Sequence, residues 1–263
     1  MQPILNNAVK AVRRAASIIN RAATQLDLVT VQTKSHNDFV TEVDRAAEAA
    51  IIGVLRETYP DHAILAEESG LSGGESEYCW IIDPLDGTTN FIHDFPQYAI
   101  SVALARNNVV EHGVVYDPVR NELFTASKGS GAFLNDRRIR VSKRTRLSDA
   151  LIGTGFPFSQ NEHLEAYINT FRELATHTAG MRRPGAAALD LAWLAAGRVD
   201  GFWEFGLQPW DMAAGALLVQ EAGGLVSDFA GESNYLESGR CIAGTPKIFG
   251  QLLPIVQKHM GSK

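Results

Sequence analysis

Four strand-like runs between residues 98 and 141 constrain the fold of this chain more than any other feature of its sequence. The runs are separated by Asn-Asn, Asp-Pro and glycine-containing turns, a spacing typical of an antiparallel meander. They read YAISVALAR, VVEHGVVYDP, NELFTASKG and RIRVSK. An antiparallel block argues against a simple doubly wound nucleotide-binding fold. The sequence also contains no G-x-G-x-x-G or Walker motif, which weakens that class further.

The second half of the chain alternates between strand-like and helical patterns. Strands are predicted for the runs LIGTGF, VDGFWEF and LVSDF. Helices are predicted for residues 162–175, for GAAALDLAWLAAG, for DMAAGALLVQEAGG and for the segment after Thr245. Two further helices are predicted over residues 1–26 and 44–59. A mixture of this kind favours layers of sheet and helix.

The composition is typical of a soluble globular protein. Hydrophobic residues make up 45% and charged residues 21% of the 263 positions, which provides an ample core. We therefore expect one domain over residues 1–263, with an antiparallel sheet in residues 1–145 and a mixed sheet in residues 146–263. The net charge of −6 excludes a general attraction for nucleic acid or anionic membrane, because both require clustered cations.

Cysteine usage and hydropathy indicate a cytoplasmic protein. Cys79 and Cys241 are too few for a disulfide framework and lack zinc-finger spacing, which favours a reducing compartment. No apolar run approaches the roughly 20 residues that span a bilayer, and no signal peptide is visible. Residues 1–26 are basic and lack acids, as in an organellar transit peptide. Their apolar residues recur at helical spacing, however, so we favour a first helix with a basic outer face.

Two carboxylates stand at the exit of an apolar run in the stretch WIIDPLDGTTNFIH. Mg²⁺ prefers oxygen ligands, and Asp83 and Asp86 suit that role. Pro84 stiffens the turn between them, which makes the Leu85 carbonyl a further candidate ligand. Gly87 permits a backbone conformation that other residues resist, and the threonines after it can cap a helix whose amides face an anion. The alternative is an ordinary turn, since Asp, Pro and Gly all favour turns.

Other acids occupy comparable places along the chain. Glu67 and Glu68 end the strand-like run HAILAEE, while Asp44 follows Thr41 at the spacing of a capping box. Asp211 precedes an alanine-rich helix, where an N-cap is the commonest use of aspartate. Each acid therefore has an ordinary structural explanation on its own. If the acids converge, a repulsion of roughly 4 kcal/mol per pair at ~4 Å and a dielectric constant of about 20 requires cations among them.

Two motifs far apart in the sequence carry a family resemblance. WIIDPLDGTTNFIH and WDMAAGALLVQEAGG resemble the paired signature of the inositol monophosphatase family, which are lithium-sensitive, Mg²⁺-dependent phosphomonoesterases. The resemblance is strongest to the bacterial branch and covers nearly the whole chain. Further matching segments are DFVTEVD, YPDHAILAEES, FTASKGSGAFLN and RRPGAAALDLAWLAAGRVDGFWE. The resemblance implies an α/β (α+β) fold built as a layered α-β-α-β-α sandwich.

The resemblance also implies a set of site residues. Two to three Mg²⁺ ions would be held by Glu67, Asp83, the Leu85 carbonyl, Asp86 and Asp211. The catalytic residues that orient the attacking water would be Glu67, Thr88 and Asp44. The substrate-binding residues would be Gly87, Thr88, Gly185, Ala187, Glu204 and Asp211. Residues 90–93 receive no role.

The activity that the resemblance implies is hydrolysis of inositol 1-phosphate, and of similar small phosphates, to myo-inositol or another alcohol and phosphate. Two metals about 4 Å apart would activate the water and neutralise phosphoryl charge. Sister families that share the D-P-x-D-G core imply fructose 1,6-bisphosphatase or nucleotide 3′-phosphatase activity as the alternatives. A covalent phospho-enzyme through Asp83 is a mechanistic rival, which metal ligation of that carboxylate disfavours.

Partners follow from the same resemblance. Bacterial members are linked to transcription complexes on ribosomal RNA operons, which makes Nus factors and RNA polymerase candidate partners of a non-catalytic role. The basic stretch KRTR, residues 143–146, is one candidate surface. Arg182 and Arg183 are another, with surface solvation, a subunit interface and substrate contact as alternatives. A homodimer is also implied, and AAALDLAWLAAG is a candidate segment for its interface.

Two positions depart from the family's pattern. Ala66 stands where a glycine commonly precedes the paired glutamates. The segment Pro184-Gly185-Ala186 lacks the serine or threonine often found after that glycine. Neither departure removes a metal ligand, but the second removes a hydroxyl near the inositol-binding wall. We therefore expect the phosphatase chemistry to be fixed more firmly than the choice of alcohol.

Overall fold

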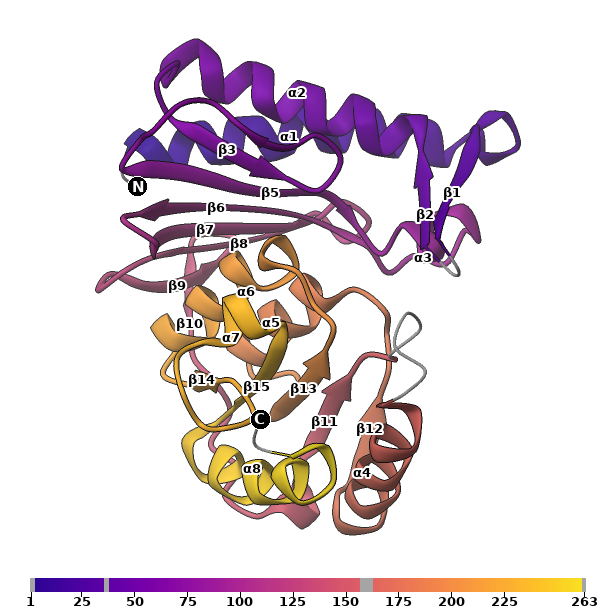
Figure 1. The fold of residues 1–263 in the computed structure, drawn as a ribbon, viewed down its shortest axis with the longest axis vertical. Helices are drawn as coiled ribbons and strands as arrows, with labels where there is room; N and C mark the ends of the chain where they lie inside the picture. Colours follow the sequence, from indigo (N-terminus) through magenta and orange to yellow (C-terminus); the bar gives the residue numbers. More distant parts are fainter. Residues whose placement is uncertain (1–2, 36–37, 157–162, 262–263) are drawn as a thin grey trace.

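The computed structural model describes residues 3–35, 38–156 and 163–261, and Figure 1 shows their arrangement. Two long N-terminal helices, α1 (Pro3–Ala23) and α2 (Glu42–Thr58), cover one face of an eight-stranded sheet. Apolar residues of α1 at helical spacing are buried, and its basic residues are exposed, as the sequence predicts. Between the two helices lie η1 (Leu26–Leu28) and the hairpin of β1 (Val31–Ser35) and β2 (Asp38–Thr41).

The eight-stranded sheet has the order β10-β9-β8-β7-β6-β5-β3-β4. The antiparallel meander predicted for residues 98–141 is confirmed as β6 to β10, with β9 as a fifth strand that the sequence did not predict. Strand β5 extends it on one side by pairing antiparallel with β6, and β3 pairs in parallel with β5. The bounds are β3 Ala63–Ala66, β4 Gly70–Ser72, β5 Tyr78–Asp86, β6 Ala99–Arg106, β7 Val109–Asp117, β8 Glu122–Ser127, β9 Gly131–Leu134 and β10 Arg137–Ile139. Because β3 runs parallel to β5 and Ala66 pairs with Ile82, Glu67 leaves β3 beside Asp83 of β5.

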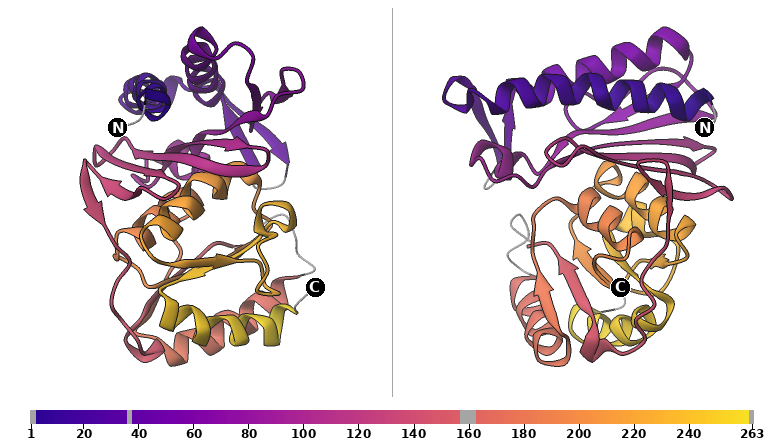
Figure 2. Two further views of the ribbon diagram at one scale, coloured as in Figure 1. Left: turned by 90° about the vertical axis from the view of Figure 1, so that its left-hand side faces the viewer. Right: turned by 180° about the vertical axis from the view of Figure 1, so that it is seen from behind.

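The second half forms a helical layer and a smaller mixed sheet. Helices α5 (Ala187–Ala195) and α6 (Pro209–Glu221) lie between the two sheets, and α4 (Leu164–His177) and α8 (Pro246–Met260) cover the outer face of the second sheet (Figure 2). That sheet has the order β12-β11-β13-β15-β14, with bounds β11 Leu151–Thr154, β12 Gly180–Arg182, β13 Gly201–Phe205, β14 Leu225–Ser227 and β15 Arg240–Gly244. Short helices α3 (Thr88–Ile92), α7 (Tyr235–Ser238) and η2 (Leu147–Asp149) complete the described chain.

The resulting succession of helix, sheet, helix, sheet and helix confirms the predicted layered α-β-α-β-α architecture. The helix predicted over residues 162–175 is α4, and its expected first residue, 162, lies outside the described residues. Of the helices within the described ranges, none is long and apolar enough to cross a membrane.

The central helices correct one expectation about surfaces. Almost every residue of α5 is buried within the chain itself, because the helix is covered by a sheet on each side. The apolar residues of AAALDLAWLAAG therefore belong to the core and do not offer a broad interface for a partner. Small side chains suit this place because they let α5 approach α6 closely.

The local structure corrects two predictions about caps. The helix after Asp86 begins at Thr88, and its N-cap is Gly87, with φ at 95°, where the sequence predicted a threonine cap. Asp211 stands at the third position of α6 and not at its N-cap, which is Gln208. The capping box of Thr41 and Asp44 at the start of α2 is confirmed.

Close packing of α5 on α6 leads to a stability prediction. A Cβ on Gly215 would lie 2.6 Å from the Leu191 Cβ, too close for unperturbed packing. Gly215→Ala is therefore expected to lower the free energy of unfolding by about 1–3 kcal/mol, measured by urea denaturation. Gly53→Ala on α2 is the control, because nothing lies within 4 Å of its added methyl group. It should raise stability by up to about 1 kcal/mol. Equal effects of the two changes would contradict the packing argument.

Candidate active site

Strand β5 carries Asp83 and Asp86 to the edge where β3 also ends. The regular pairing with β6 is interrupted between these residues, since Asp83 pairs with Ser101 and Asp86 with Ala99. Asp83 is 2% exposed, and its Oδ1 accepts a hydrogen bond from the Leu85 amide at 2.9 Å. The irregularity re-aims the chain at this point, as bulges do. The apolar run therefore ends with one fully buried carboxylate and a second one three residues later.

Asp86 ties this strand to the second half of the chain. Its Oδ2 accepts a hydrogen bond of 2.7 Å from the Ala188 amide, in the first turn of α5. The Ala187 and Leu189 amides add to this favourable environment, since all three lower the Asp86 pKa. Burial has the larger effect and raises the pKa to about 6. Asp86 is thus both a helix-capping group and a member of the acid cluster.

Asp211 comes to the same place from the start of α6. Its Oδ2 accepts a hydrogen bond from the Gln208 amide at 2.7 Å, which fixes the side chain in the first helical turn. The preceding residue is anchored as well, because Ser101 of β6 donates to the Trp210 carbonyl at 3.0 Å. Asp211 also shares a hydrogen bond with the Asp83 side chain. Asp211 of the motif WDMAAG therefore lies next to Asp83 of the DPLD segment.

The pKa shifts show that four acids, Glu67, Asp83, Asp86 and Asp211, lie close enough to affect one another. Burial raises the Asp83 pKa well above its ordinary value, and the charges of Glu67, Asp86 and Asp211 raise it further. For Asp211, burial acts first, followed by Asp86 and then Glu67. Glu67 reaches the cluster from the end of β3, where its amide donates to the Ile82 carbonyl at 3.1 Å. The four acids, which no single motif could show to be neighbours, therefore lie together in the folded chain.

The donor set fits a hard divalent cation. Carboxylate oxygens and a backbone carbonyl are the ligands that Mg²⁺ prefers, and mutual repulsion of the acids favours a cation among them. The side chains do not already form a cage, because no three His, Cys, Asp or Glu residues in the described parts of the chain are arranged to hold an ion.

A hydrogen-bonded pair stands beside the cluster. Thr88 Oγ1 donates to Asp44 Oδ1 at 2.8 Å and also lies 3.1 Å from the Leu85 carbonyl oxygen. The other Asp44 oxygen accepts from the Thr41 amide at 2.8 Å and from the Thr41 hydroxyl at 2.5 Å. Asp44 is fully buried, so its orientation is fixed by these contacts. The structure thereby joins the start of α2 to the loop that follows β5.

Gly87 and Gly185 meet between the two halves of the site. A Cβ on Gly87 would lie 2.9 Å from the Gln97 carbonyl oxygen and 3.2 Å from that of Gly185. Both glycines have positive φ, at 95° and 91°, which other residues rarely adopt. Ala187 follows as the first residue of α5. This close approach places the predicted substrate-binding segment next to the loop that carries Asp86.

Glu204 of β13 forms a further wall. Its Oε1 would lie only 1.7 Å from a Cβ on Gly155, so that glycine provides the space for the carboxyl group. The Glu204 pKa is raised to about 8, first by burial and then by the charges of Asp211 and Asp86, which outweigh the opposing charge of Arg183. Glu204 is therefore within electrostatic reach of the acid cluster, as its predicted substrate-binding role requires.

The raised Glu204 pKa predicts a pH dependence of stability. A carboxyl group whose pKa rises from 4.5 to about 8 on folding binds protons more tightly in the folded state, so its contribution to stability falls as pH rises through that window. In metal-free protein, the free energy of unfolding of the wild type should decline relative to Glu204→Gln between pH 5 and pH 8. Urea denaturation at several pH values measures this difference. A constant difference across the window would contradict the prediction.

Asn90 is a structural member of the site that the sequence does not reveal. Its Nδ2 lies within donor distance of three carbonyl oxygens, those of Gln97 at 2.7 Å, Pro184 at 2.9 Å and Gly185 at 3.2 Å. The side chain thereby fixes the Gly185 segment against the loop after β5. No local pattern signals this role, because the contacts span more than ninety residues of sequence.

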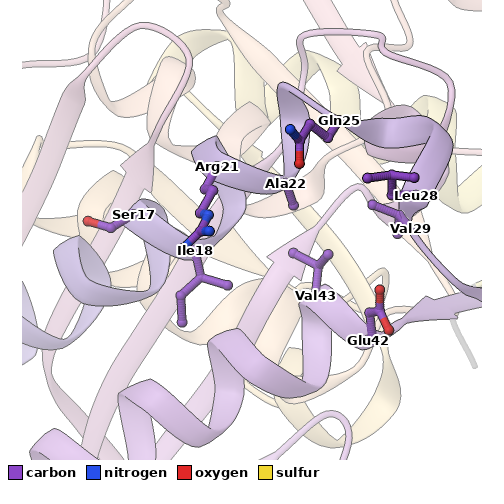
Figure 3. A pocket seen from close by; sticks show the side chains of 9 residues that line it. All are labelled: Ser17, Ile18, Arg21, Ala22, Gln25, Leu28, Val29, Glu42 and Val43. Atoms are coloured by element: carbon purple, nitrogen blue, oxygen red, sulfur yellow. The ribbon is translucent and has the colours of Figure 1, made fainter.

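A separate hollow of about 610 Å³ lies between the end of α1 and the start of α2, and Figure 3 shows the side chains around it. Of the described residues that line it, Glu42 is the one acid, and Arg21 extends into the same region. Its lining shares no residue with the acid cluster. The concentration of buried carboxylates, and not the size of a cavity, therefore identifies the candidate active site.

Comparisons with known proteins agree with this geometry. The profile of the inositol monophosphatase family matches residues 1–261. The Nus factor SuhB of Pseudomonas aeruginosa is 57% identical over 99% of this chain and 98% of its own length. The crystal structure of the extragenic suppressor protein suhB from Bartonella henselae has a TM-score of 0.95 at 43% identity, covering 98% of this chain and 99% of that one. Inositol monophosphatase from Anabaena (Nostoc) has a TM-score of 0.87 at 39% identity, covering 97% and 95%.

Proposed function

Because the chain belongs to the inositol monophosphatase family, whose members are generally metal-dependent phosphatases, we propose that it is a Mg²⁺-dependent phosphomonoesterase that converts inositol 1-phosphate and water to myo-inositol and phosphate. One observation carries the proposal. Four acids from three segments gather beside a threonine–aspartate pair: Glu67 follows β3, Asp83 and Asp86 belong to β5, and Asp211 lies in the first turn of α6. The site draws on both halves, which supports treating residues 1–263 as one functional domain.

The metals would be held by Glu67, Asp83, Asp86, Asp211 and the Leu85 carbonyl. Two to three bound Mg²⁺ ions supply an activated water and neutralise charge on the phosphoryl group. The chain's own contribution is to hold these acids in a buried place, where oxygen ligands interact strongly with cations. Phosphate oxygens are assigned to the Gly87 and Thr88 amides. The alcohol is assigned to Gly185, Ala187, Glu204 and Asp211.

The Thr88–Asp44 pair is suited to orient the attacking water. The Thr88 hydroxyl gives its proton to Asp44 at 2.8 Å, so the Thr88 oxygen keeps a lone pair that can accept a hydrogen bond from water. Asp44 in turn is held by Thr41 and cannot rotate freely. A proton that leaves the water can pass to Thr88 while Thr88 passes its own to Asp44. Glu67 is the third group proposed to position that water.

A substrate panel with and without Mg²⁺ and Li⁺ tests the proposal. Purified protein should release phosphate from inositol 1-phosphate with Mg²⁺, lose this activity with a chelator, and be inhibited by Li⁺. Fructose 1,6-bisphosphate and a nucleoside 3′-phosphate belong in the panel as the alternative substrates, compared by kcat/KM. If no sugar or inositol phosphate is hydrolysed with Mg²⁺, the proposed activity is wrong.

A second, non-catalytic function is favoured by the relatives' names. The relative from Pseudomonas aeruginosa is a Nus factor, so we propose transcription-complex proteins, including Nus factors and RNA polymerase, as further partners. The KRTR stretch is a poorer surface than its composition implies. Arg144 pairs with the buried Asp200 at 3.2 Å, and Arg146 pairs with Asp149 at 2.7 Å. A pull-down with wild-type and Asp83→Asn protein tests this role, and no retention of either would argue against it.

Cellular location and assembly are also proposals. A cytoplasmic homodimer fits the proposed phosphatase and the transcription-related partners alike. Since the helix α5 is buried within each chain, the dimer contact has to be sought on other surfaces. Light scattering of the purified protein gives the mass in solution directly. A monomeric mass at micromolar concentration would count against the dimer.

A further inference from the structure

Arg183 directly follows β12 and lies beside Gly185, one of the residues assigned to the substrate's alcohol. We propose that Arg183 determines substrate specificity by binding, together with Glu204, neighbouring hydroxyl groups of the substrate's alcohol. The inference rests on the proposed function and names the chemistry that the alcohol must present. The sequence left three explanations open for Arg183, namely surface solvation, a subunit interface and substrate contact. The folded chain favours the last one.

The backbone aims the guanidinium toward the site. Arg183 directly follows β12, and Gly185, with φ at 91°, turns the chain two residues later. Arg183 Nη1 lies 2.7 Å from the place that a Cβ on Gly185 would take. Any side chain at position 185 would therefore collide with the guanidinium. Gly185 therefore both permits the turn and leaves room for the Arg183 guanidinium. Asn90 holds the same segment in place by donating to the Pro184 carbonyl.

The surroundings of Arg183 come from three other elements. Its positive charge acts on Glu204 of β13, on Asp190 of α5 and on Tyr167 of α4. Glu204 is the residue whose carboxyl group fills the space above Gly155. The Gly185 carbonyl, beside the guanidinium, lies 3.2 Å from the Cβ position of Gly87 on the phosphate side. A substrate whose phosphate sits at Gly87 therefore extends its alcohol toward Arg183 and Glu204.

The chemistry of this pair suits a diol. A hydroxyl group both donates and accepts, a guanidinium only donates, and a carboxyl group accepts through its oxygens in either protonation state. Arg183 can donate to one hydroxyl oxygen while Glu204 accepts from its neighbour. Arg183 is exposed, and its guanidinium carries five N–H donors in a planar fork, which suits a hydrogen bond to a hydroxyl oxygen beside its contacts within the protein. A second phosphate is disfavoured, because Glu204 and Asp190 flank the same guanidinium.

Substrate selectivity of matched variants tests this inference. The ratio of kcat/KM for inositol 1-phosphate to that for p-nitrophenyl phosphate, which has no alcohol hydroxyls, is measured with Mg²⁺. In Arg183→Gln this ratio should fall about tenfold or more, mainly through a higher KM for inositol 1-phosphate, as expected for a lost hydrogen bond to a charged group. Arg183→Lys should restore part of it, since a lysine keeps the charge without the planar fork. The control is Arg182→Gln, because Arg182 Nη1 donates to its neighbour Met181 at 2.8 Å. It should leave the ratio unchanged.

Three outcomes would overturn the inference. An equal loss on both substrates would assign Arg183 a structural role, and a changed mass in light scattering would assign it to an interface. A loss that is greatest for fructose 1,6-bisphosphate would mean that Arg183 binds a second anion. These outcomes differ from a failure of the proposed function, in which the wild-type protein would hydrolyse none of the three substrates.

Discussion

Asp83→Asn is expected to lower kcat/KM for inositol 1-phosphate by about 10²–10³-fold or more, the scale on which one preorganised electrostatic group contributes to catalysis. The same change should raise the thermal stability of the metal-free protein. Asp83 is 2% exposed, and Glu67, Asp86 and Asp211 all raise its pKa, so its ionised carboxylate destabilises the folded state of the metal-free protein. An amide of the same shape relieves that cost but is a poor metal ligand. Phosphate release and a thermal melt measure the two effects.

Asp94→Asn is the matched control for this experiment. It makes the same chemical change shortly after α3, at an exposed position outside the acid cluster. Activity and melting temperature should both stay close to those of the wild type. Added Mg²⁺ should raise the melting temperature of the wild type and of Asp94→Asn, because a ligand stabilises the state that binds it. An Asp83→Asn protein that keeps full activity would remove the central premise of the proposed function.

Thr88→Ala is expected to lower kcat by about 10²–10⁴-fold, the range typical of a positioned proton-transfer group. The change deletes the hydroxyl that donates to Asp44 at 2.8 Å, which leaves the buried Asp44 without the bridge to water. The change removes a contact to the Leu85 carbonyl but no ligating oxygen, so the increase in melting temperature caused by Mg²⁺ should persist. Steady-state kinetics and a thermal melt of the same preparation separate the loss of proton transfer from a loss of metal.

Two control variants test whether the effect of Thr88→Ala comes from the loss of its hydroxyl group. Thr89→Ala removes the neighbouring hydroxyl, which is exposed, and should leave kcat unchanged. Thr88→Ser keeps the hydroxyl and should retain most of the activity. If Thr88→Ala retains wild-type kcat, or if Thr89→Ala is equally damaged, the Thr88–Asp44 pair has no part in orienting the water.

Much of the fold was predictable because its signals are local. The period of the apolar residues identified α1 and α2, and the turn chemistry identified the strands β6, β7, β8 and β10 but not the short strand β9. Strand β15 was missed although it lies inside its sheet, between β13 and β14. Its sequence, RCIAG, is poor in the β-branched and aromatic residues that mark strands. Burial between neighbouring strands, and not intrinsic propensity, stabilises it there.

The residues of the site that belong to local sequence motifs could be predicted from the sequence. Acids at strand ends were visible, but only the folded chain shows that Asp83 and Asp211 share a hydrogen bond across more than a hundred residues. The family resemblance predicted that these acids lie together. The topology explains why they do, because β3 and β5 run parallel and α6 begins beside them. Asn90 escaped assignment because its hydrogen bond to the Pro184 carbonyl joins segments 94 residues apart, and no spacing rule encodes such a contact. For Arg183 the sequence left solvation, a subunit interface and substrate contact open.

The hydrogen bond between Asp86 and α5 has a consequence for regulation. One oxygen of this carboxylate is already engaged by the Ala188 amide, so a cation bound at Asp86 would share its ligand with the first turn of α5. The position of α5 and the occupancy of the cation are then thermodynamically linked through a single side chain. Any macromolecule that shifts α5 would alter affinity for the ion, and the ion would alter affinity for that macromolecule by the same factor. A catalytic role and a binding role in one chain would then communicate without a dedicated regulatory domain.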